Sequence, residues 1–182
     1  MPVLASAVVL VGAICLLNLL LTVGVVRRLR VHDQRLAETG PAGRRRLEPG
    51  AAIGPFTATA TDGHTVSAAA LPPRSVVGFF SPACGPCLEQ IPRFVDFASG
   101  LPGGREQVLA VVCGPAQDAA PLAGQLEPVA RVVVEGTGGA LAEAFATMAF
   151  PSIFVTDGEG RIRASGGTVD VLDFATVSGG VL

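Results

Sequence analysis

The sequence contains no tryptophan, no tyrosine and no lysine, so its nine phenylalanines are the only aromatic residues and its thirteen basic residues are all arginines. Only four cysteines and two histidines occur among 182 residues. Four cysteines are too few for disulfide bonds to be the main source of stability in a chain of this length, because its hydrophobic core can supply that stability. The sparse aromatic residues and the lack of a basic patch in the body of the chain argue against a nucleic-acid partner. These absences exclude a disulfide-stapled scaffold and a nucleic-acid-binding protein.

Charge divides the chain into two unlike parts. The first fifty residues carry seven arginines and three acidic residues, whereas the remainder carries six arginines and twelve acidic residues. The whole chain has a formal net charge of −2. A basic neck joined to an acidic body indicates two parts in different surroundings.

Residues 3–26 carry no charge and are rich in leucine and valine. A helix of that length reaches roughly 36 Å, and the hydrocarbon core of a bilayer is about 30 Å thick. We therefore expect residues 1–26 to form a transmembrane anchor that contacts membrane lipid through residues 3–26. A cleaved signal peptide is the alternative, although no positive side chain precedes the segment and no small-residue cleavage site follows it.

Residues 27–50 follow as a basic stalk and linker, with a Gly-Pro pair at positions 40 and 41. Arginines 27, 28 and 30 lie directly after the span. By the positive-inside rule they predict that the domain beyond them is cytoplasmic.

From residue 51 to the end, short apolar runs alternate with glycine, proline and aspartate. Continuous apolar runs predict strands buried on both faces, and apolar residues at helical spacing predict the helices between them. The expected elements are a hairpin over 56–67, a strand over 75–80, a helix from 84 or 85, a strand over 107–112, a helix over 118–126, a strand over 131–134, a helix over 139–149, hairpin strands over 152–156 and 161–164, and a terminal helix from 170 to 174. This order predicts an α/β domain over residues 51–182, with a central mixed sheet flanked by helices.

The motif Cys84-Gly85-Pro86-Cys87 lies where the strand over 75–80 ends and a helix begins. The thiolate is the reactive form of cysteine, and a helix N-terminus concentrates positive potential, so we expect a lowered pKa at Cys84. Cys87, one turn later, is more sheltered. Pro86 suits an early helical position, and Gly85 leaves room for a partner chain. We therefore expect a redox couple in which Cys84 attacks a disulfide and Cys87 resolves the mixed disulfide.

Structural zinc and an inert cysteine pair are the alternatives for this motif. The chain has no second cysteine pair, and His32 and His64 lack the spacing of zinc ligands, so we expect no metal and no other cofactor. Cys113, at the end of a strand, is expected to be a small buried residue. Glu89 is expected to be a solvated helix residue, and His64 a surface residue.

The run VVGFFSPACGPCLEQIPRF, residues 76–94, resembles the active-site segment of thioredoxin-like proteins. Residues 89–92 (EQIP) resemble the membrane-anchored TlpA/ResA-type branch. Residues 81–84 (SPAC), together with the anchor and the basic neck, are similar to MauD-type methylamine-utilisation proteins. The resemblance covers roughly residues 50–175. It implies that residues 51–182 form a thioredoxin-like domain with thiol-disulfide oxidoreductase activity.

A second part of the resemblance is Ala149-Phe150-Pro151-Ser152, which precedes an expected strand. In this family a cis-proline stands at that place and faces the dithiol, which implies that Pro151 is cis. A cis X-Pro bond leaves the backbone groups of the preceding residue free to pair with a substrate. The resemblance thus adds Phe150 and Pro151 to the substrate-binding residues, beside Gly85 and Pro86.

Two positions depart from the family pattern. Ala83 stands where an aromatic residue usually precedes the first cysteine, and Gly78 stands where thioredoxins carry a buried acid. The sequence therefore identifies no proton acceptor for Cys87.

Together these features predict a single-pass cell-membrane enzyme that exchanges disulfides with exported client proteins, most simply as a reductase in protein maturation. A membrane redox partner would donate or accept the electrons. This function favours an extracytoplasmic domain, whereas the arginines after the span favour the opposite side. One alternative is a peroxiredoxin-like peroxidase, although Val77 and Ser81 stand where that chemistry needs Pro and Thr. The other is a tethered module that binds clients or metal without turnover.

Overall fold

The structure is a computed structural model that describes Gly12 and residues 46–169. The predicted anchor, most of the predicted stalk and the predicted helix at 170–174 lie outside the described residues. Within the described part of the chain, no helix is both long and apolar enough to cross a bilayer.

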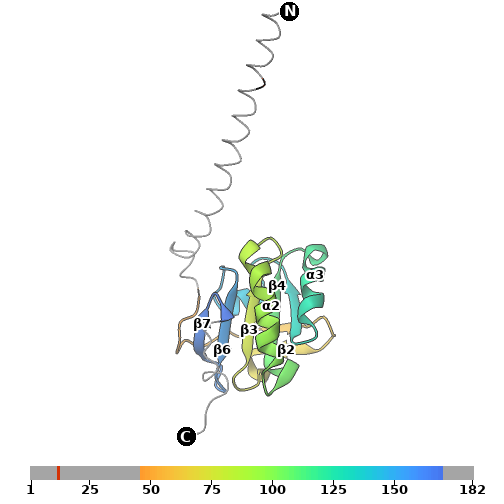
Figure 1. Cartoon of the computed structure of the whole chain (residues 1–182). Coiled ribbons are helices and arrows are strands. Elements are labelled where there is room, and N and C mark those ends of the chain that lie inside the picture. The colour runs from red at the N-terminus through yellow and green to blue at the C-terminus, as the bar shows by residue number, and fades with distance from the viewer. Residues whose placement is uncertain (1–11, 13–45, 170–182) are drawn as a thin grey trace, which may run out of the picture. The chain divides into compact units, whose positions relative to one another are not determined.

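A mixed five-stranded sheet forms the centre of the domain (Figure 1). Strands β3, β4 and β5 run parallel, and β6 and β7 add antiparallel pairs on the other side of β3. Every residue of β3, β4 and β6 is buried, which explains the continuous apolar sequences of β3 and β4. The predicted central mixed sheet is therefore confirmed. Its strand order is β5 (Arg131–Glu135), β4 (Val108–Cys113), β3 (Val76–Phe80), β6 (Ser152–Thr156) and β7 (Ile162–Gly166).

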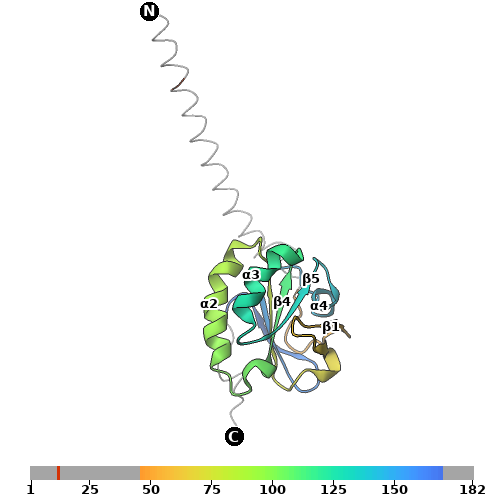
Figure 2. The same cartoon turned by 90° about the vertical axis from the view of Figure 1, so that its right-hand side faces the viewer.

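Helices cover both faces of the sheet, as predicted. Helices α2 (Gly85–Ser99) and α3 (Ala116–Leu126) lie on one face. The short helix α4 (Ala140–Ala144) lies on the other face together with strand β1 (Figure 2). Two hydrophobic cores result, one on each side of the sheet. Two 3-10 turns complete the elements, Ala68–Ala70 and Gly104–Gln107.

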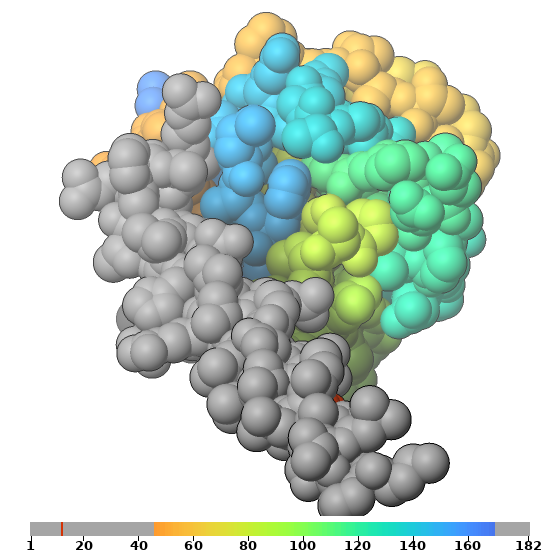
Figure 3. Space-filling view, turned by 90° about the horizontal axis from the view of Figure 1, so that it is seen from above, coloured from red at the N-terminus to blue at the C-terminus, as the bar shows by residue number. Residues whose placement is uncertain are grey.

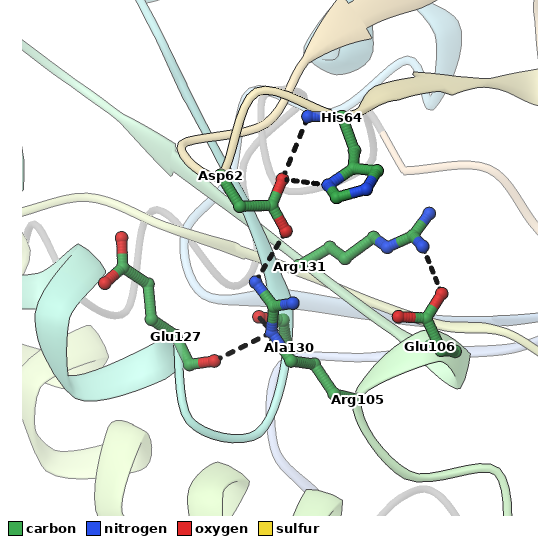
Figure 4. Close-up of polar contacts among 7 residues, drawn as sticks. All are labelled: Asp62, His64, Arg105, Glu106, Glu127, Ala130 and Arg131. Carbon is green, nitrogen blue, oxygen red and sulfur yellow. Dashed lines mark hydrogen bonds and ion pairs between the residues drawn. The ribbon is translucent and has the colours of Figure 1, made fainter.

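The predicted N-terminal hairpin is present as a separate two-stranded sheet of β1 (Thr57–Thr59) and β2 (Thr65–Ser67). Its turn contains Gly63 at a φ of 83°, a backbone conformation that glycine adopts at little cost. The adjacent Asp62 accepts a hydrogen bond from Arg105 at 2.7 Å (Figure 4). Arg105 also donates to the carbonyls of Glu127 and Ala130, at 3.0 and 3.1 Å, and so ties the hairpin to the end of α3.

Helix α4 is shorter than the sequence predicted. We expected a helix over 139–149, but it ends at Ala144, and Ala146 has a φ of 46°. Phe145 turns into the core, where its ring centroid lies 5.3 Å from that of Phe79. Burying the phenylalanine stabilises the domain more than another helical turn would, since a buried aromatic side chain removes a large apolar area from water.

Candidate active site at the start of helix α2

The dithiol motif lies at the carboxyl end of the central strand β3. Cys84 is the N-cap of the 15-residue helix α2, and its sulfur accepts a hydrogen bond from the backbone N–H of Cys87 at 3.3 Å. Pro86 lies in the first turn, where a missing N–H costs nothing. Gly85 is exposed, and apart from its chain neighbours and the backbone of its own helix nothing lies within 4 Å of the place a Cβ would take. The first cysteine therefore sits at an open helix terminus.

The two thiols differ in access to solvent. Cys84 is partly exposed, whereas Cys87 is fully buried in the core beneath α2. Both are free thiols. Cys84 is therefore the thiol of this pair that a molecule in solution can reach, whereas the order of attack stays a prediction.

The surroundings of Cys84 favour its thiolate. The hydrogen bond from the Cys87 thiol, together with that from the Cys87 backbone N–H, lowers the pKa of Cys84 to about 7, and partial burial opposes part of this effect. The first turn of α2, all of which the structure describes, holds no acidic side chain that would weaken the helix dipole. Near neutral pH a substantial fraction of Cys84 is therefore the nucleophilic thiolate.

The surroundings of Cys87 have the opposite effect. Its hydrogen bond to Cys84 and its burial both raise the pKa of the Cys87 thiol well above its usual range. Cys87 therefore keeps its proton while Cys84 is a thiolate.

The loop before β6 faces the dithiol. The Phe150–Pro151 peptide bond is cis, as the resemblance implied. The Cys84 thiol donates to the carbonyl oxygen of Phe150 at 3.4 Å. In Figure 3 the yellow-green residues around the start of α2 lie next to the blue residues around the start of β6. The structure thus brings Cys84, Cys87, Phe150 and Pro151 together, with Gly85 and Pro86 between the two cysteines.

Two exposed apolar side chains belong to the segments that carry the site, and sequence reasoning missed both. Among the described residues, Leu88 and Met148 are the large hydrophobic side chains that remain exposed, each by 49 %. The Leu88 N–H donates to the Cys84 carbonyl at 3.3 Å, and Met148 lies two residues before Phe150. Leu88 therefore lies one turn after Cys84 in α2, and Met148 lies in the segment that leads to the cis-proline.

Gly78 shows why no buried acid lies beneath the dithiol. A Cβ at this position would lie 2.7 Å from a ring atom of Phe80 and 2.9 Å from a ring atom of Phe94. Those two rings meet edge to face, with centroids 5.0 Å apart. Aromatic packing therefore fills the space in which thioredoxins hold a carboxyl group.

Cys113 ends β4 and is buried, as the sequence predicted. Burial, with the nearby Glu135 carboxylate, raises the pKa of Cys113 to about 12, so this cysteine stays a thiol at neutral pH. Its sulfur lies 3.9 Å from Glu135, whose carboxylate accepts the backbone N–H groups of Leu141 and Ala142 at 3.0 and 2.9 Å. Glu135 therefore caps α4, a role that nothing in its local sequence indicated.

Glu89 and His64, the two remaining residues discussed from the sequence, are both exposed. Glu89 is exposed on α2. The His64 side chain is 66 % exposed and lies 3.2 Å from Asp62 in the hairpin turn (Figure 4). Both are surface residues, as predicted.

Comparison with known proteins gives one family. Residues 49–165 match the AhpC/TSA family. No protein with a curated description matches the chain significantly.

Solved structures share the fold across most of the chain. The thioredoxin domain of a thiol-disulfide oxidoreductase from Bacteroides vulgatus is 19 % identical, with a TM-score of 0.58 over 73 % of this chain and 97 % of that one. A thio-disulfide isomerase from Thermus thermophilus is 20 % identical, with a TM-score of 0.57 over 75 % and 100 %. A thiol:disulfide interchange protein from a Bacteroides species is 16 % identical, with a TM-score of 0.57 over 74 % and 93 %. At these identities the likeness shows the fold alone, which is thioredoxin-like.

Proposed function

The chain belongs to the AhpC/TSA family, and we propose that within this family it is a thiol-disulfide oxidoreductase whose working groups are Cys84 and Cys87. One observation carries the proposal. A partly exposed thiol caps α2 above a buried partner thiol and hydrogen-bonds to the carbonyl of Phe150, next to a cis-proline. This arrangement gives one accessible nucleophile and one sheltered resolving group.

In the reducing direction the reaction has two exchange steps. The Cys84 thiolate attacks one sulfur of the client disulfide, which forms a mixed disulfide and releases one client thiolate to take up a proton. Cys87, once deprotonated, attacks the Cys84 sulfur and expels the second client thiolate. The client gains two electrons and two protons, and the chain is left with a Cys84–Cys87 disulfide. A membrane redox partner with a dithiol would then return the electrons.

The hydrogen bond between the two thiols delays deprotonation of Cys87 until the second step, in which Cys87 attacks the mixed disulfide. While Cys84 is a thiolate, it stabilises the protonated form of Cys87 and holds its pKa high. Once Cys84 is bound in a mixed disulfide, it no longer accepts that hydrogen bond as an anion. Deprotonation of Cys87 then becomes easier at the moment when its thiolate is needed.

The surface around Cys84 suits a polypeptide client. The backbone of Phe150 beside cis-Pro151 offers hydrogen-bonding groups to an extended chain. Leu88 in α2 and Met148, two residues before Phe150, are exposed and offer apolar contacts to a client. We propose that the clients are disulfide-containing proteins.

We further propose that the enzyme is anchored in the cell membrane and acts on exported proteins, as TlpA/ResA-type and MauD-type proteins do. The uncharged residues 3–26 support the anchor. The short motifs at residues 81–84 and 89–92 support the comparison with these types.

Single cysteine variants test the two assigned roles with insulin as a protein disulfide and dithiothreitol as the reductant. We expect Cys84→Ser to abolish turnover and to trap no client. Cys87→Ser should lose turnover and, when the reduced protein meets insulin after dithiothreitol has been removed, should accumulate mixed disulfides. Cys113→Ser is the matched control and should keep turnover, because Cys113 is buried away from solvent. Equal loss in the first two variants, without trapping in either, would contradict the assigned roles.

A peroxidase is the second candidate, because the family match itself favours it. In that reaction Cys84 would attack a peroxide without help from Cys87. The residues that such chemistry needs before the nucleophile are replaced by Val77 and Ser81. Hydrogen peroxide consumption by the Cys87→Ser variant, at the rate of the unmodified chain, would favour the peroxidase over the disulfide oxidoreductase.

A further inference from the structure

The segment that leads into the domain lies against the edge of the sheet. The backbone N–H of Gly50 donates to Ile162 at 2.7 Å, and the N–H of Ile162 donates to Ala51 at 2.8 Å. The Arg161 side chain donates to the carbonyl of Gly50 at 3.0 Å. The end of the predicted stalk is thus bound to β7 instead of hanging free of the domain.

Arg46, in the same segment, reaches the loop that carries the cis-proline. Its Nε donates to the hydroxyl of Ser152 at 3.1 Å, and one Nη donates to the carbonyl of Pro151 at 3.4 Å. Burial lowers the pKa of the guanidinium, which nevertheless stays charged at neutral pH. The planar fork of an arginine can reach these two acceptors together, whereas the point charge of a lysine cannot.

The two acceptors belong to a buried polar network behind the site. Thr147 and Ser152 are both fully buried. The Thr147 hydroxyl donates to that of Ser152 at 3.1 Å, and the Ser152 hydroxyl donates to the carbonyl of Ala149 at 2.7 Å. Arg46 is therefore part of a network that fixes residues 147–152. This is the loop in which the Phe150 carbonyl meets Cys84.

We propose that Arg46 is a positioning residue that holds residues 147–152 in the shape that receives the client, and so couples the end of the stalk to the site. The inference rests on the proposed function, because it assigns the client to the same loop.

Removal of Arg46 should weaken the binding of the client more than it slows the thiol-disulfide exchange steps. Without Arg46, the buried Ser152 hydroxyl and the Pro151 carbonyl each lose a charged donor. The loop then spends less time in the receptive shape, which weakens the apparent affinity for any client that pairs with it. Arg46 does not touch either thiol in the described contacts, so the exchange steps themselves should keep their rate.

Steady-state kinetics on the detergent-solubilised full chain can separate an effect on client binding from an effect on the exchange steps. We expect Arg46→Ala to raise the KM for insulin roughly tenfold, as for the loss of one hydrogen bond to a charged group, and to leave kcat within about twofold. A small aromatic disulfide, which has no chain to pair with the loop, should react at an unchanged rate. Arg161→Ala is the matched control, because it removes a side-chain hydrogen bond to the same segment at Gly50 without touching the loop.

Hydrogen exchange gives a readout that does not need turnover. Arg46→Ala should speed amide exchange in peptides that cover residues 147–152, whereas Arg161→Ala should not. If Arg46→Ala does not fold, Ser152→Ala removes the acceptor from the loop side and should give the same two effects.

The proposal is overturned if Arg46→Ala matches the unmodified chain in both measurements, or if Arg161→Ala has the same effects as Arg46→Ala. Absence of disulfide reduction by the unmodified chain would defeat the proposed function instead. The exchange experiment would then still decide whether Arg46 holds the loop.

Discussion

At the scale of single residues, Cys84 determines the pH at which the dithiol reacts. Its pKa of about 7 lies below the usual 9.0, chiefly because of the hydrogen bond from Cys87. The thiolate is therefore populated above pH 7 and lost below it. We expect the rate of iodoacetamide alkylation at Cys84, measured on reduced Cys113→Ser protein, to rise through a midpoint near pH 7. Cys87→Ala should move that midpoint upward, and a midpoint near 9 before this substitution would contradict the assignment.

Gly78 permits a second test, because its neighbours leave no room for a side chain. Gly78→Ala should destabilise the domain by about 1–3 kcal/mol, since the new Cβ would force apart the Phe80 and Phe94 rings. Gly78→Asp, which restores the acid found in thioredoxins, should destabilise it further and not speed exchange. Thermal unfolding measures both variants.

The exposed helical Gly124 is the matched control for Gly78. Apart from its chain neighbours and the backbone of its own helix, nothing lies within 4 Å of its Cβ position, so Gly124→Ala should stabilise α3 by up to about 1 kcal/mol. A Gly78→Ala protein as stable as Gly124→Ala would show that the aromatic packing is looser than described.

The residues of the site differ in how far the sequence could predict them. The local sequence predicts the positions of Cys84 and Cys87, because a buried strand, a turn and the start of a helix lie next to one another in the chain. The proline at 151 followed from the family resemblance. Arg46 could not be found this way, because it contacts Ser152 across 106 positions of sequence and no local pattern marks it.

At the scale of elements, α4 depends on a carboxylate that comes from the neighbouring strand. Glu135 accepts two backbone N–H groups at the start of the helix, and a Cβ at Gly139 would clash with its carboxylate. Glu135→Ala should therefore cost about 0.5–2 kcal/mol, as for the loss of a helix cap. Glu135→Gln keeps an acceptor and should cost less. Chemical denaturation separates the two, and equal stability of Glu135→Ala and the unmodified chain would exclude the cap.

Strand positions were predicted better than helix lengths, for a physical reason. β3 and β4 are buried on both faces, so their apolar runs stand out in the sequence. Helix α4 ends early because Phe145 packs among rings contributed by distant strands. The composition of residues 139–149 favours a helix throughout and contains no sign of that tertiary contact.

At the scale of the whole molecule, the site lies at the carboxyl ends of the parallel strands of the sheet. Cys84 follows β3, Cys113 ends β4 and Glu135 ends β5, and these three parallel strands bring their carboxyl ends to the same edge. Parallel strands joined by helices all point the same way, so their carboxyl ends meet. The buried core thus fixes the fold, while the segments at its edge carry the chemistry.

Under the proposed anchoring in the cell membrane, the side of the membrane on which residues 51–182 lie determines which client proteins they can meet. The proposed clients are exported proteins, whereas arginines 27, 28 and 30 favour a cytoplasmic domain. We expect a membrane-impermeant maleimide to label Cys84 in intact cells that produce the full chain, and to label it further after reduction if the dithiol rests as a disulfide. Cys113, buried in the folded domain, should stay unlabelled and reports that the domain is intact. Labelling of Cys84 only after lysis would place the domain in the cytoplasm and remove exported proteins as clients, while leaving the exchange chemistry of the two thiols as it stands.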